Sequence, residues 1–312
     1  MSILITVDGG TTNTRVCLVK DEKILATQKI ALGARAGIDG KAPLAKALKE
    51  SIANLLQQFD LRETDVEAIL ASGMITSEFG LYTLPHIPLP AGISRLHQGM
   101  KKVTLEEISS IPFRFIPGVK AMGADFLTSD MIRGEETELM GILDASFGDC
   151  VYVLPGSHSK VIKTDKEGRI EDFSTLLSGE MAQALAENTI LKGALDLSID
   201  RIDGDYLKKG YFYCREHGIN QSLFKARILK VLFDGDPVAI YSFFLGAVLC
   251  GEVGEILRYG AKTVVIGGKR QLREALAIIL TEVGGMKVIA LTEEEVQTSV
   301  TRGMLRIYSA KV

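Results

Sequence analysis

The chain has 312 residues, of which 46% are hydrophobic and 24% are charged, with 31 Gly and 8 Pro. This composition excludes disorder, collagen and low-complexity sequence, and the length predicts two domains. The 36 basic and 39 acidic side chains give a net charge of -3, so no overall charge attracts nucleic acid or an anionic membrane, and any anionic ligand must be held by local groups.

The cysteine and histidine residues do not indicate a structural metal site. The four cysteines lie far apart without a CxxC pair, and the four histidines show no HxxxH spacing. Free thiols fit a reducing cytoplasm, which is where we expect the protein. Residues 1–7 lack the features of a signal peptide, and the longest apolar run, residues 238–250, is shorter than the ~18 residues of a membrane span. We therefore expect no membrane insertion.

Strand and helix patterns in the first half of the chain occur in the order βββαβ. Apolar residues at helical spacing from Leu44 to Phe59 predict an amphipathic helix after the third strand. The β-branched runs bounded by turn residues predict strands at 3–7, 15–19, 24–30 and 66–70.

The same order returns in the second half, which indicates a structural duplication. Gly9 and Gly156 occupy equivalent turns, and a helix through Leu272 and Ile279 precedes the last strand. The strands of this half are predicted at 150–154, 160–163, 169–176, 263–266 and 287–290. We predict two lobes, residues 1–146 and 147–312.

Two further helices have clear end signals. Asp236 is a good N-cap, Pro237 suits the first helical position and Gly260 suits the stop, so the sequence predicts a helix over 237–259. This helix is apolar on more than one face, which favours a buried core helix. Thr292 and Glu295 have the spacing of a capping box and predict the start of a C-terminal helix.

The turn at residues 8–13, DGGTTN, follows a buried strand and is rich in Gly, Thr and Asn. Such a turn can direct several backbone N–H groups and hydroxyls at one anion, although Asp-Gly between two strands is also the strongest ordinary hairpin signal. The second half repeats the pattern at 155–159, PGSHS. Two such loops could hold the phosphates of a nucleotide, with Asp8 as a ligand of Mg²⁺.

Two other segments could carry chemistry. The acidic residues after Arg133 and Gly134 open a helix, where they are either a solvated N-terminus or a carboxylate that accepts a proton from a hydroxyl nucleophile. Gly267 and Gly268 follow a buried strand and are either a plain loop or a place where a flat ring lies close to the backbone. We reject a nucleophilic role for the serines beside His158, because no acidic partner is spaced to orient that histidine.

Together these segments resemble the superfamily of sugar kinases, chaperone ATPases and actins. Residues 8–13 resemble its first phosphate motif, 154–160 its second and 266–268 its adenosine motif. Within it, the chain resembles the 2-dehydro-3-deoxygalactonokinase family along nearly its whole length. The matching patterns are PLPAG at 88–92, IPGVK at 116–120, RGEET at 133–137, PGSHSK at 155–160 and FSTLLSGE at 173–180, of which RGEET and PGSHSK are the specific ones.

The resemblance implies an α/β protein of two ribonuclease H-like βββαβα lobes with an ATP and substrate cleft between them. It implies an ATP- and Mg²⁺-dependent kinase of the terminal hydroxyl of 2-dehydro-3-deoxy-D-galactonate, giving the 6-phosphate in galactonate degradation. The family usually has an aromatic residue where Gly9 stands and tryptophan where Val161 stands, and this chain has no Trp. Both departures flank the phosphate loops rather than the acidic motif.

The resemblance and the residue types give each candidate a role. We predict Glu135 as the base, with Glu136 as the alternative, and Asp8 as the metal ligand. For the substrate carboxylate we prefer Arg133 to Lys120, because a guanidinium offers two parallel hydrogen bonds. The remaining expected sugar-acid ligands are Gly73, Pro90 and Gly92. The expected nucleotide ligands are Asp8, Gly10, Thr11, Thr12, Asn13, Gly156, Ser157, His158, Ser159, Gly267 and Gly268.

Two other functions stay open at this point. The chain could be a kinase of another sugar or sugar acid, or an ATPase that uses lobe closure to move a partner protein. The acidic motif and residues 85–92, PHIPLPAG, favour a small-molecule site over a partner interface. The sequence leaves a homodimer open.

Overall fold

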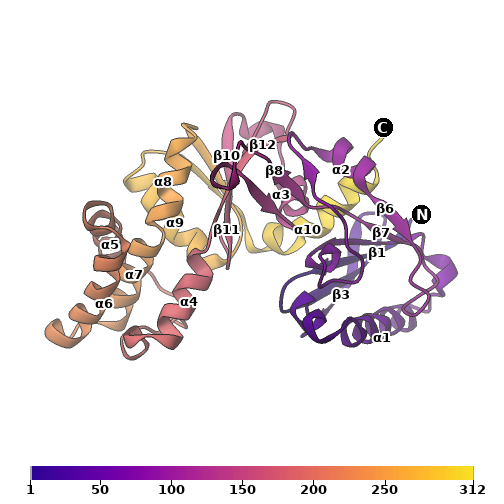
Figure 1. Ribbon diagram of the computed structural model, residues 1–312, viewed down its shortest axis with the longest axis horizontal. Helices are drawn as coiled ribbons and strands as arrows, with labels where there is room; N and C mark the ends of the chain where they lie inside the picture. The colour runs from indigo at the N-terminus through magenta and orange to yellow at the C-terminus, as the bar shows by residue number, and fades with distance from the viewer. Residues whose placement is uncertain (1, 312) are drawn as a thin grey trace. The chain divides into compact units, whose positions relative to one another are not determined.

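The computed structural model describes residues 2–311, apart from the side chains of residues 36, 38 and 39. It divides into two compact units, which we describe in turn (Figure 1). The first unit comprises Met1–Asp144, Glu167–Glu171 and Gln297–Val312, and the second comprises Ala145–Lys166 and Asp172–Val296.

The first unit contains a six-stranded sheet in the order β3-β2-β1-β4-β7-β6. Strands β1 and β2 are antiparallel, whereas β1 and β4 are parallel. Gly9 and Gly73 therefore pair where these two central strands end. The strands are β1 (Ile3–Gly9), β2 (Thr14–Lys20), β3 (Lys23–Ile30), β4 (Ala68–Gly73), β6 (Lys101–Val103) and β7 (Phe113–Phe115). The fourth strand, predicted at 66–70, is found at Ala68–Gly73, after a 3₁₀ helix at Glu63–Asp65.

The core of this unit lies between the sheet and helix α1 (Ala42–Gln58). Ile5 and Val7 of β1 pack with Leu48 and Ile52 of the helix, and all four are at most 1% exposed. The predicted amphipathic spacing is confirmed, since the buried positions of α1 recur every three or four residues.

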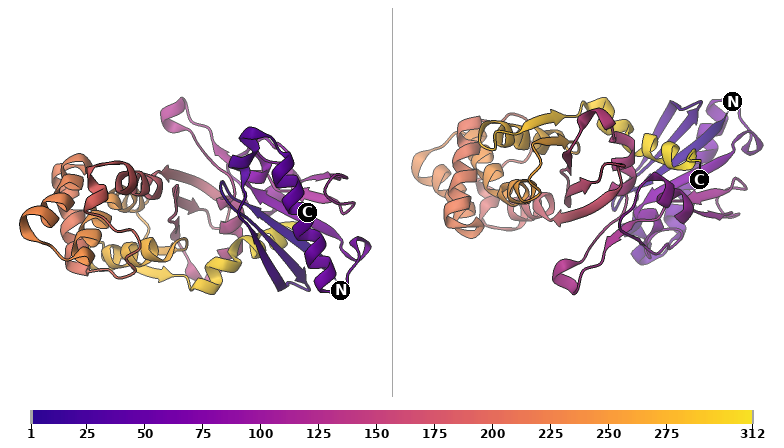
Figure 2. Two further views of the ribbon diagram at one scale, coloured as in Figure 1. Left: turned by 90° about the horizontal axis from the view of Figure 1, so that it is seen from below. Right: turned by 90° about the horizontal axis from the view of Figure 1, so that it is seen from above.

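A second, three-stranded sheet completes the first unit in the order β5-β8-β9. Its strands are β5 (Ile87–Pro88), β8 (Val119–Ala121) and β9 (Asp130–Ile132). The connection between β8 and β9 forms an arm that projects from its sheet in both views of Figure 2. Helix α2 (Ile93–Gly99) follows β5 in sequence, and α3 (Glu135–Ile142) follows β9.

The second unit repeats the strand arrangement with a five-stranded sheet in the order β12-β11-β10-β13-β14. Strands β10 and β11 are antiparallel, and β10 and β13 are parallel. The first unit has the same arrangement in β1, β2 and β4. The strands are β10 (Cys150–Leu154), β11 (Ser159–Thr164), β12 (Ile170–Leu176), β13 (Thr263–Ile266) and β14 (Lys287–Ala290). The predicted duplication of strand order is thus visible in the fold.

Helices fill the long connection between β12 and β13. They are α4 (Ser178–Asn188), α5 (Gly204–His217), α6 (Ile219–Phe233), α7 (Pro237–Val248) and α8 (Cys250–Arg258), and α9 (Arg270–Glu282) follows β13. The single helix predicted over 237–259 is divided at Leu249, which leaves the regular helix at φ -78° and ψ 0°. By length and mean hydropathy Pro237–Arg258 could cross a membrane, contrary to the estimate from its apolar run. However, 67% of its 18-residue apolar window is buried inside the protein.

Helix α10 (Glu293–Tyr308) corrects the predicted division of the chain. Residues 297–312 were expected in the C-terminal lobe, but they belong to the first unit. There Arg306 donates hydrogen bonds of 2.9 Å to the carbonyls of Met140 and Leu143 at the end of α3. The predicted capping box is confirmed, because Thr292 N and Glu295 N each donate to the other residue's side chain.

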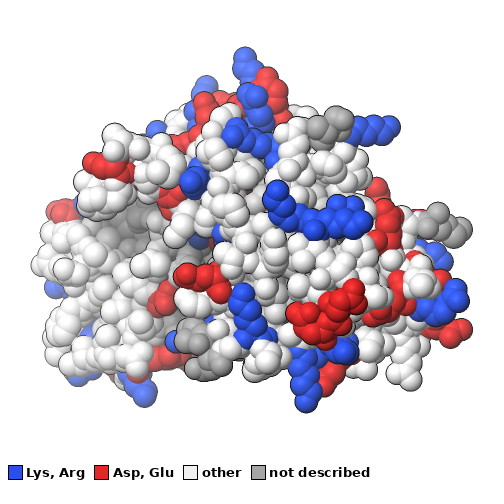
Figure 3. Space-filling model, turned by 45° about the vertical axis from the view of Figure 1, so that its right-hand side comes forward, with Lys and Arg blue, Asp and Glu red and all other residues white. Residues whose placement is uncertain are grey.

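One face of the molecule carries charged residues of both signs. On the face shown in Figure 3, basic and acidic side chains lie next to one another among uncharged surface. This distribution agrees with the small net charge of -3. A face of this kind produces no extended field of one sign.

We predict that Gly303→Ala destabilises the fold, because α3 and α10 touch through glycine. A Cβ at Gly303 would lie 1.8 Å from the carbonyl oxygen of Thr137. The helices would have to separate, and we expect the free energy of unfolding to fall by about 1–3 kcal/mol. Urea unfolding monitored by circular dichroism measures this change. Arg302→Ala at an exposed position of the same helix is the matched control and should change stability little.

Candidate functional site

The turn between β1 and β2 is held by hydrogen bonds and a close backbone contact on one side and has unbonded N–H groups on the other. Gly10 N donates to Asn13 O at 2.9 Å, and Arg35 N donates to Thr11 O at 2.9 Å. A Cβ at Gly33 would lie 2.5 Å from Gly10 O, so the supporting segment approaches the turn too closely for a side chain. Within residues 2–311, the backbone N–H groups of Thr11 and Thr12 donate no hydrogen bond. These groups are available to an anion, as the sequence predicts.

Two glycines bring the start of α3 against the ends of β1 and β4. Gly73 ends β4 with φ +83° and Gly134 precedes α3 with φ +110°, a backbone region that favours glycine. A Cβ on Gly134 would lie 3.2 Å from Gly73 Cα, and one on Gly73 would lie 3.6 Å from Asp8 Oδ1. The predicted residues Asp8, Gly73 and Glu135 therefore lie together in the first unit.

The carboxyl groups at this place affect one another. Burial raises the pKa of Asp8, Arg15 lowers it and Glu135 raises it. Burial, Glu135 and Asp8 together raise the pKa of Glu138 to about 8. Glu135 itself is partly exposed and accepts a hydrogen bond of 3.1 Å from Arg133 N. It is therefore a carboxylate that a ligand can reach.

Glu136 has a different environment from its neighbour Glu135. It is fully buried, accepts a hydrogen bond of 2.7 Å from Gly134 N and one of 3.0 Å from the hydroxyl of Thr137. Burial and the nearby Glu135 raise its pKa to about 8. Glu136 thus stabilises the first turn of α3, and its carboxyl is closed to a substrate. Of the two predicted bases, this geometry favours Glu135.

The guanidinium of Arg133 is engaged by the protein itself. Its Nη1 donates to the carbonyl and hydroxyl oxygens of Thr76, and its Nη2 donates to Leu84 O at 2.9 Å. Nη2 also lies 3.3 Å from Nδ1 of His86. Four of its five N–H groups are directed at these partners, so a two-pronged bond to a substrate carboxylate would have to break them.

Lys120 is the other predicted cation, and its side chain is not engaged in this way. It lies in β8 and is partly exposed, and its ammonium forms no hydrogen bond or ion pair with the described residues. Burial, Arg133 and Lys120 lower the pKa of His86 to about 4, so the three side chains are neighbours. The structure therefore favours Lys120 over Arg133 as a cation for an anionic ligand.

Pro90 and Gly92 line a separate cavity of the first unit. This cavity, of about 720 Å³, is bounded also by Arg95, Leu143 and Arg169. Leu143 follows the C-terminal end of α3, whereas Glu135 begins the same helix. Eight residues of helix separate these places by about 12 Å. The structure does not bring Pro90 and Gly92 to the carboxylates.

The loop of residues 155–159 in the second unit lies against the N-terminus of α4. Glu180 N donates to Ser157 O at 3.0 Å, and a Cβ at Gly179 would lie 2.1 Å from Gly156 O. Gly156 N donates to the hydroxyl of the buried Ser159 at 3.4 Å. Ser157 and His158, in contrast, are exposed. The loop is supported from one side and open on the other.

His158 has an acidic partner, contrary to the expectation from the sequence. Its Nε2 lies 2.5 Å from Oε2 of Glu180. The partner was missed because it lies 22 positions along the chain, at the start of a helix whose place only the fold determines. Neither neighbouring serine is hydrogen-bonded to His158 among the described residues, so the rejection of a nucleophile now rests on this geometry.

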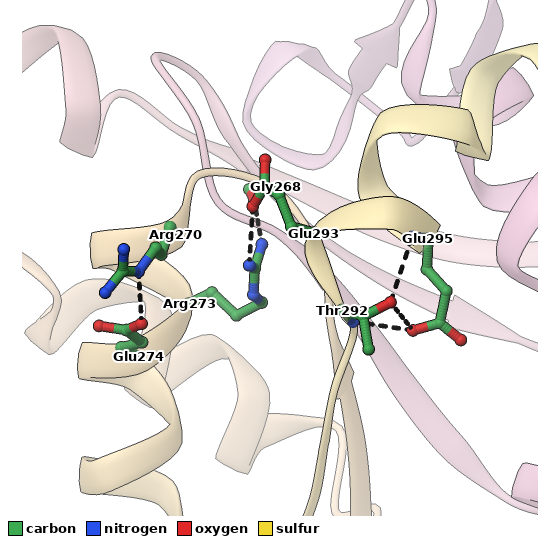
Figure 4. A network of polar contacts seen from close by, with 7 residues as sticks. All are labelled: Gly268, Arg270, Arg273, Glu274, Thr292, Glu293 and Glu295. Atoms are coloured by element: carbon green, nitrogen blue, oxygen red, sulfur yellow. Dashed lines mark hydrogen bonds and ion pairs between the residues drawn. The ribbon is translucent and has the colours of Figure 1, made fainter.

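Gly267 and Gly268 lie directly against the same loop. A Cβ at Gly268 would be 2.1 Å from Pro155 O, and Lys269 N donates to that oxygen at 2.9 Å. Arg273 of α9, also missed in the sequence, is buried and donates to Gly268 O at 2.6 Å and to Glu293 at 3.1 Å (Figure 4). The predicted second phosphate loop and adenosine turn are therefore adjacent in the second unit.

The acidic residues offer no complete protein cage for a metal ion. Among residues 2–311, no three His, Cys, Asp or Glu side chains are grouped to hold one. Mg²⁺ is commonly bound by one or two carboxylates together with substrate phosphates. Asp8, next to a turn with free N–H groups, fits that mode of binding.

Comparisons with a family profile and with a curated protein point to the same family of kinases. The profile of a family described as 2-keto-3-deoxy-galactonokinase matches residues 8–307. A curated protein of Rhizobium meliloti (strain 1021), named a probable 2-dehydro-3-deoxygalactonokinase, is 27% identical over 194 residues, which are 61% of this chain and 58% of that protein. This alignment thus spans little more than half of the curated relative.

Solved structures with low sequence identity share the fold. One from Sinorhizobium meliloti, described as a candidate 2-dehydro-3-deoxygalactonokinase, is 22% identical, covers 98% of this chain and 100% of that chain, and has a TM-score of 0.79. Component A of (R)-2-hydroxyglutaryl-CoA dehydratase from Acidaminococcus fermentans is 15% identical, covers 99% of this chain and 96% of that chain, and has a TM-score of 0.50. The predicted α/β fold is confirmed.

The buried carboxyl of Glu136 predicts a specific pH dependence of stability. Its pKa rises from 4.5 to about 8 on folding, so the folded chain holds this proton more tightly. The stabilisation is complete below pH 4.5 and is lost as the pH rises towards 8, at a rate of at most about 1.4 kcal/mol per pH unit. Urea unfolding of Glu136→Gln should show a smaller loss between pH 5 and 8 than the wild type. Parallel losses would contradict the assignment.

Proposed function

The chain belongs to the 2-keto-3-deoxy-galactonokinase family, and on this basis we propose that it transfers the γ-phosphoryl group of ATP to the terminal hydroxyl of 2-dehydro-3-deoxy-D-galactonate. The products would be ADP and the 6-phosphate. The observation that best supports this proposal is the partly exposed carboxylate of Glu135, which begins a helix beside Asp8 at the end of β1.

Glu135 acts as the general base in this proposal. Its carboxylate takes the proton of the substrate hydroxyl, while that oxygen forms a bond to the γ-phosphorus and the bond from phosphorus to ADP breaks. Phosphoryl transfer depends mainly on positioning and on stabilising charge. The Gly73–Gly134 contact and the hydrogen bond from Arg133 N hold the base in place.

The nucleotide is assigned to the turns that each unit presents. In the second unit, the adenosine would lie at Gly267 and Gly268 and phosphates at residues 156–159, an assignment supported by the contact of Gly268 with Pro155. In the first unit, Thr11 and Thr12 offer further N–H and hydroxyl groups to phosphate. Asn13 is a further proposed ligand, and Gly10 would shape the turn, because its N–H already donates to Asn13 O. Asp8 would hold Mg²⁺, which supplies positive charge to the phosphate oxygens when bound.

The substrate carboxylate is assigned to Lys120, with Arg133 as the alternative. The ammonium of Lys120 is available, whereas the guanidinium of Arg133 is bound to Thr76, Leu84 and His86. The backbone at Gly73 lies beside the proposed base and would face the reacting end of the sugar acid. Pro90 and Gly92 remain proposed ligands only if the substrate extends to their cavity. A cytoplasmic location and a homodimer also stay predictions.

We predict that Glu135→Gln lowers kcat by about two to four orders of magnitude, which is the usual contribution of a positioned base. ATP binding should remain nearly unchanged, because the amide keeps the shape of the side chain. A coupled assay of ADP formation with a panel of sugar acids measures kcat, and calorimetry measures ATP affinity. Glu136→Gln is the control that should remain active. If only Glu136→Gln is inactive, the base is Glu136. ATP hydrolysis by the wild type that no sugar acid stimulates would instead favour a conformational ATPase.

Lys120→Met and Arg133→Lys should separate the two candidate cations. Loss of a charged partner typically weakens carboxylate binding about tenfold or more, so Lys120→Met should lower kcat/KM for the sugar acid relative to a neutral analogue of the same length. Arg133→Lys should instead lower Tm, because an ammonium cannot replace four directed bonds. The ratio of kcat/KM for acid and neutral analogue is measured in each variant. A change of this ratio in Arg133→Lys alone would assign the carboxylate to Arg133.

A further inference from the structure

Glu252 is a buried acid in α8 whose carboxyl has no partner with hydrogen-bond geometry. The residue is 0% exposed, and neither carboxyl oxygen is bonded within the part of the chain that the structure describes. Its helix neighbours Leu249, Val253 and Ile256 belong to the hydrophobic core of the second unit. Burial of an unbonded polar group is unfavourable, so packing alone does not account for a glutamate here.

The groups that face this carboxyl belong to the proposed phosphate loop and its support. Helix α8 packs against β11, the strand that begins at Ser159, and Val253 and Val161 of these two elements share one core. Burial raises the pKa of Glu252, while the nearby hydroxyls of Ser178 and Ser159 lower it. Ser178 begins α4, the helix on which the loop rests, and Ser159 ends the loop. Both serines are at most 5% exposed. Glu252 therefore lies behind the loop, on the side away from its exposed residues.

Ser159 connects this carboxyl to the loop backbone. Its hydroxyl oxygen accepts the hydrogen bond from Gly156 N at 3.4 Å. Because that oxygen is already an acceptor, the hydroxyl proton is free to be donated, and the unbonded carboxyl of Glu252, on the helix that packs against β11, is a nearby acceptor for it. A bond from Ser159 to Glu252 would fix the hydroxyl with its lone pair towards Gly156.

We infer that Glu252 is a positioning residue for nucleotide phosphate, which acts through the hydroxyl of Ser159 to hold the loop of residues 156–159 in its binding conformation. The inference rests on the proposed function, because it requires that this loop binds ATP. Glu252 does not touch the nucleotide. Its contribution is to keep the backbone N–H groups of the loop directed towards phosphate, at a cost in stability.

The decisive variant is Glu252→Leu, which fills the site with an apolar side chain. We expect KM for ATP to rise about tenfold, KM for the sugar acid to stay within about twofold, and Tm to stay equal or increase. Glu252→Gln keeps the acceptor oxygen and should stay within about threefold of the wild type for ATP. Glu255→Gln, on the same helix but bonded to Ser174 and Arg258, is the matched control and should leave both KM values unchanged.

A double variant tests whether the effect passes through Ser159. If it does, Glu252→Leu should add little to the loss of ATP affinity caused by Ser159→Ala, whereas independent roles would multiply the two losses. Calorimetry with ADP and steady-state kinetics on the full chain provide both readouts. Unchanged KM for ATP in Glu252→Leu, or a parallel loss of Tm and of both affinities, would overturn the inference. A wild type that does not bind ADP or ATP would overturn the proposed function itself.

Discussion

The arrangement of the first unit depends on a close backbone contact between Gly73 and Gly134. Gly73 ends a central strand of the sheet and Gly134 precedes α3, and both have positive φ angles. The space between them has no room for larger side chains, since a Cβ on Gly134 would already lie 3.2 Å from Gly73 Cα. This contact brings the carboxylate of Glu135 next to Asp8 of the neighbouring strand.

In the second unit, close contacts of glycine backbone likewise fix the position of a candidate binding loop. Gly179 of α4 and Gly268 after β13 pack closely against the loop of residues 155–159. A Cβ on either glycine would lie only 2.1 Å from a carbonyl oxygen of this loop. These glycine contacts hold the buried side of each loop against the protein, so that its exposed side remains available to a ligand. A loop held in this way loses little conformational entropy when a phosphate binds. Gly9 follows the same rule, because a Cβ there would lie 2.6 Å from Ile75 Cβ.

Local patterns predicted most elements, whereas long-range contacts decided the roles of side chains. Periodicity and turn residues located α1 and the repeated strands, because those signals lie within a few neighbouring residues. The partner of His158, the engagement of Arg133 by Leu84 and the place of α10 could not be predicted from the sequence, because each joins segments that only the folded chain brings together. The preference for Arg133 over Lys120 followed from side-chain chemistry alone. In the fold, however, backbone and side-chain groups of Thr76, Leu84 and His86 already occupy the guanidinium, which is why the ammonium of Lys120 is the proposed ligand.

The acids near Glu135 are arranged so that they add little charge to the place where a triphosphate is expected. Glu136 and Glu138 have pKa values raised to about 8, largely by burial, so both hold their protons at neutral pH. Neutral carboxyls do not repel phosphate, and they can still accept the hydrogen bonds that hold the start of α3. Each raised pKa opposes stability as the pH rises. The site thus keeps Glu135 as an accessible base among acids whose pKa values are raised by burial. Burial raises the pKa of Asp8 as well, and a divalent cation bound there would favour its charged form.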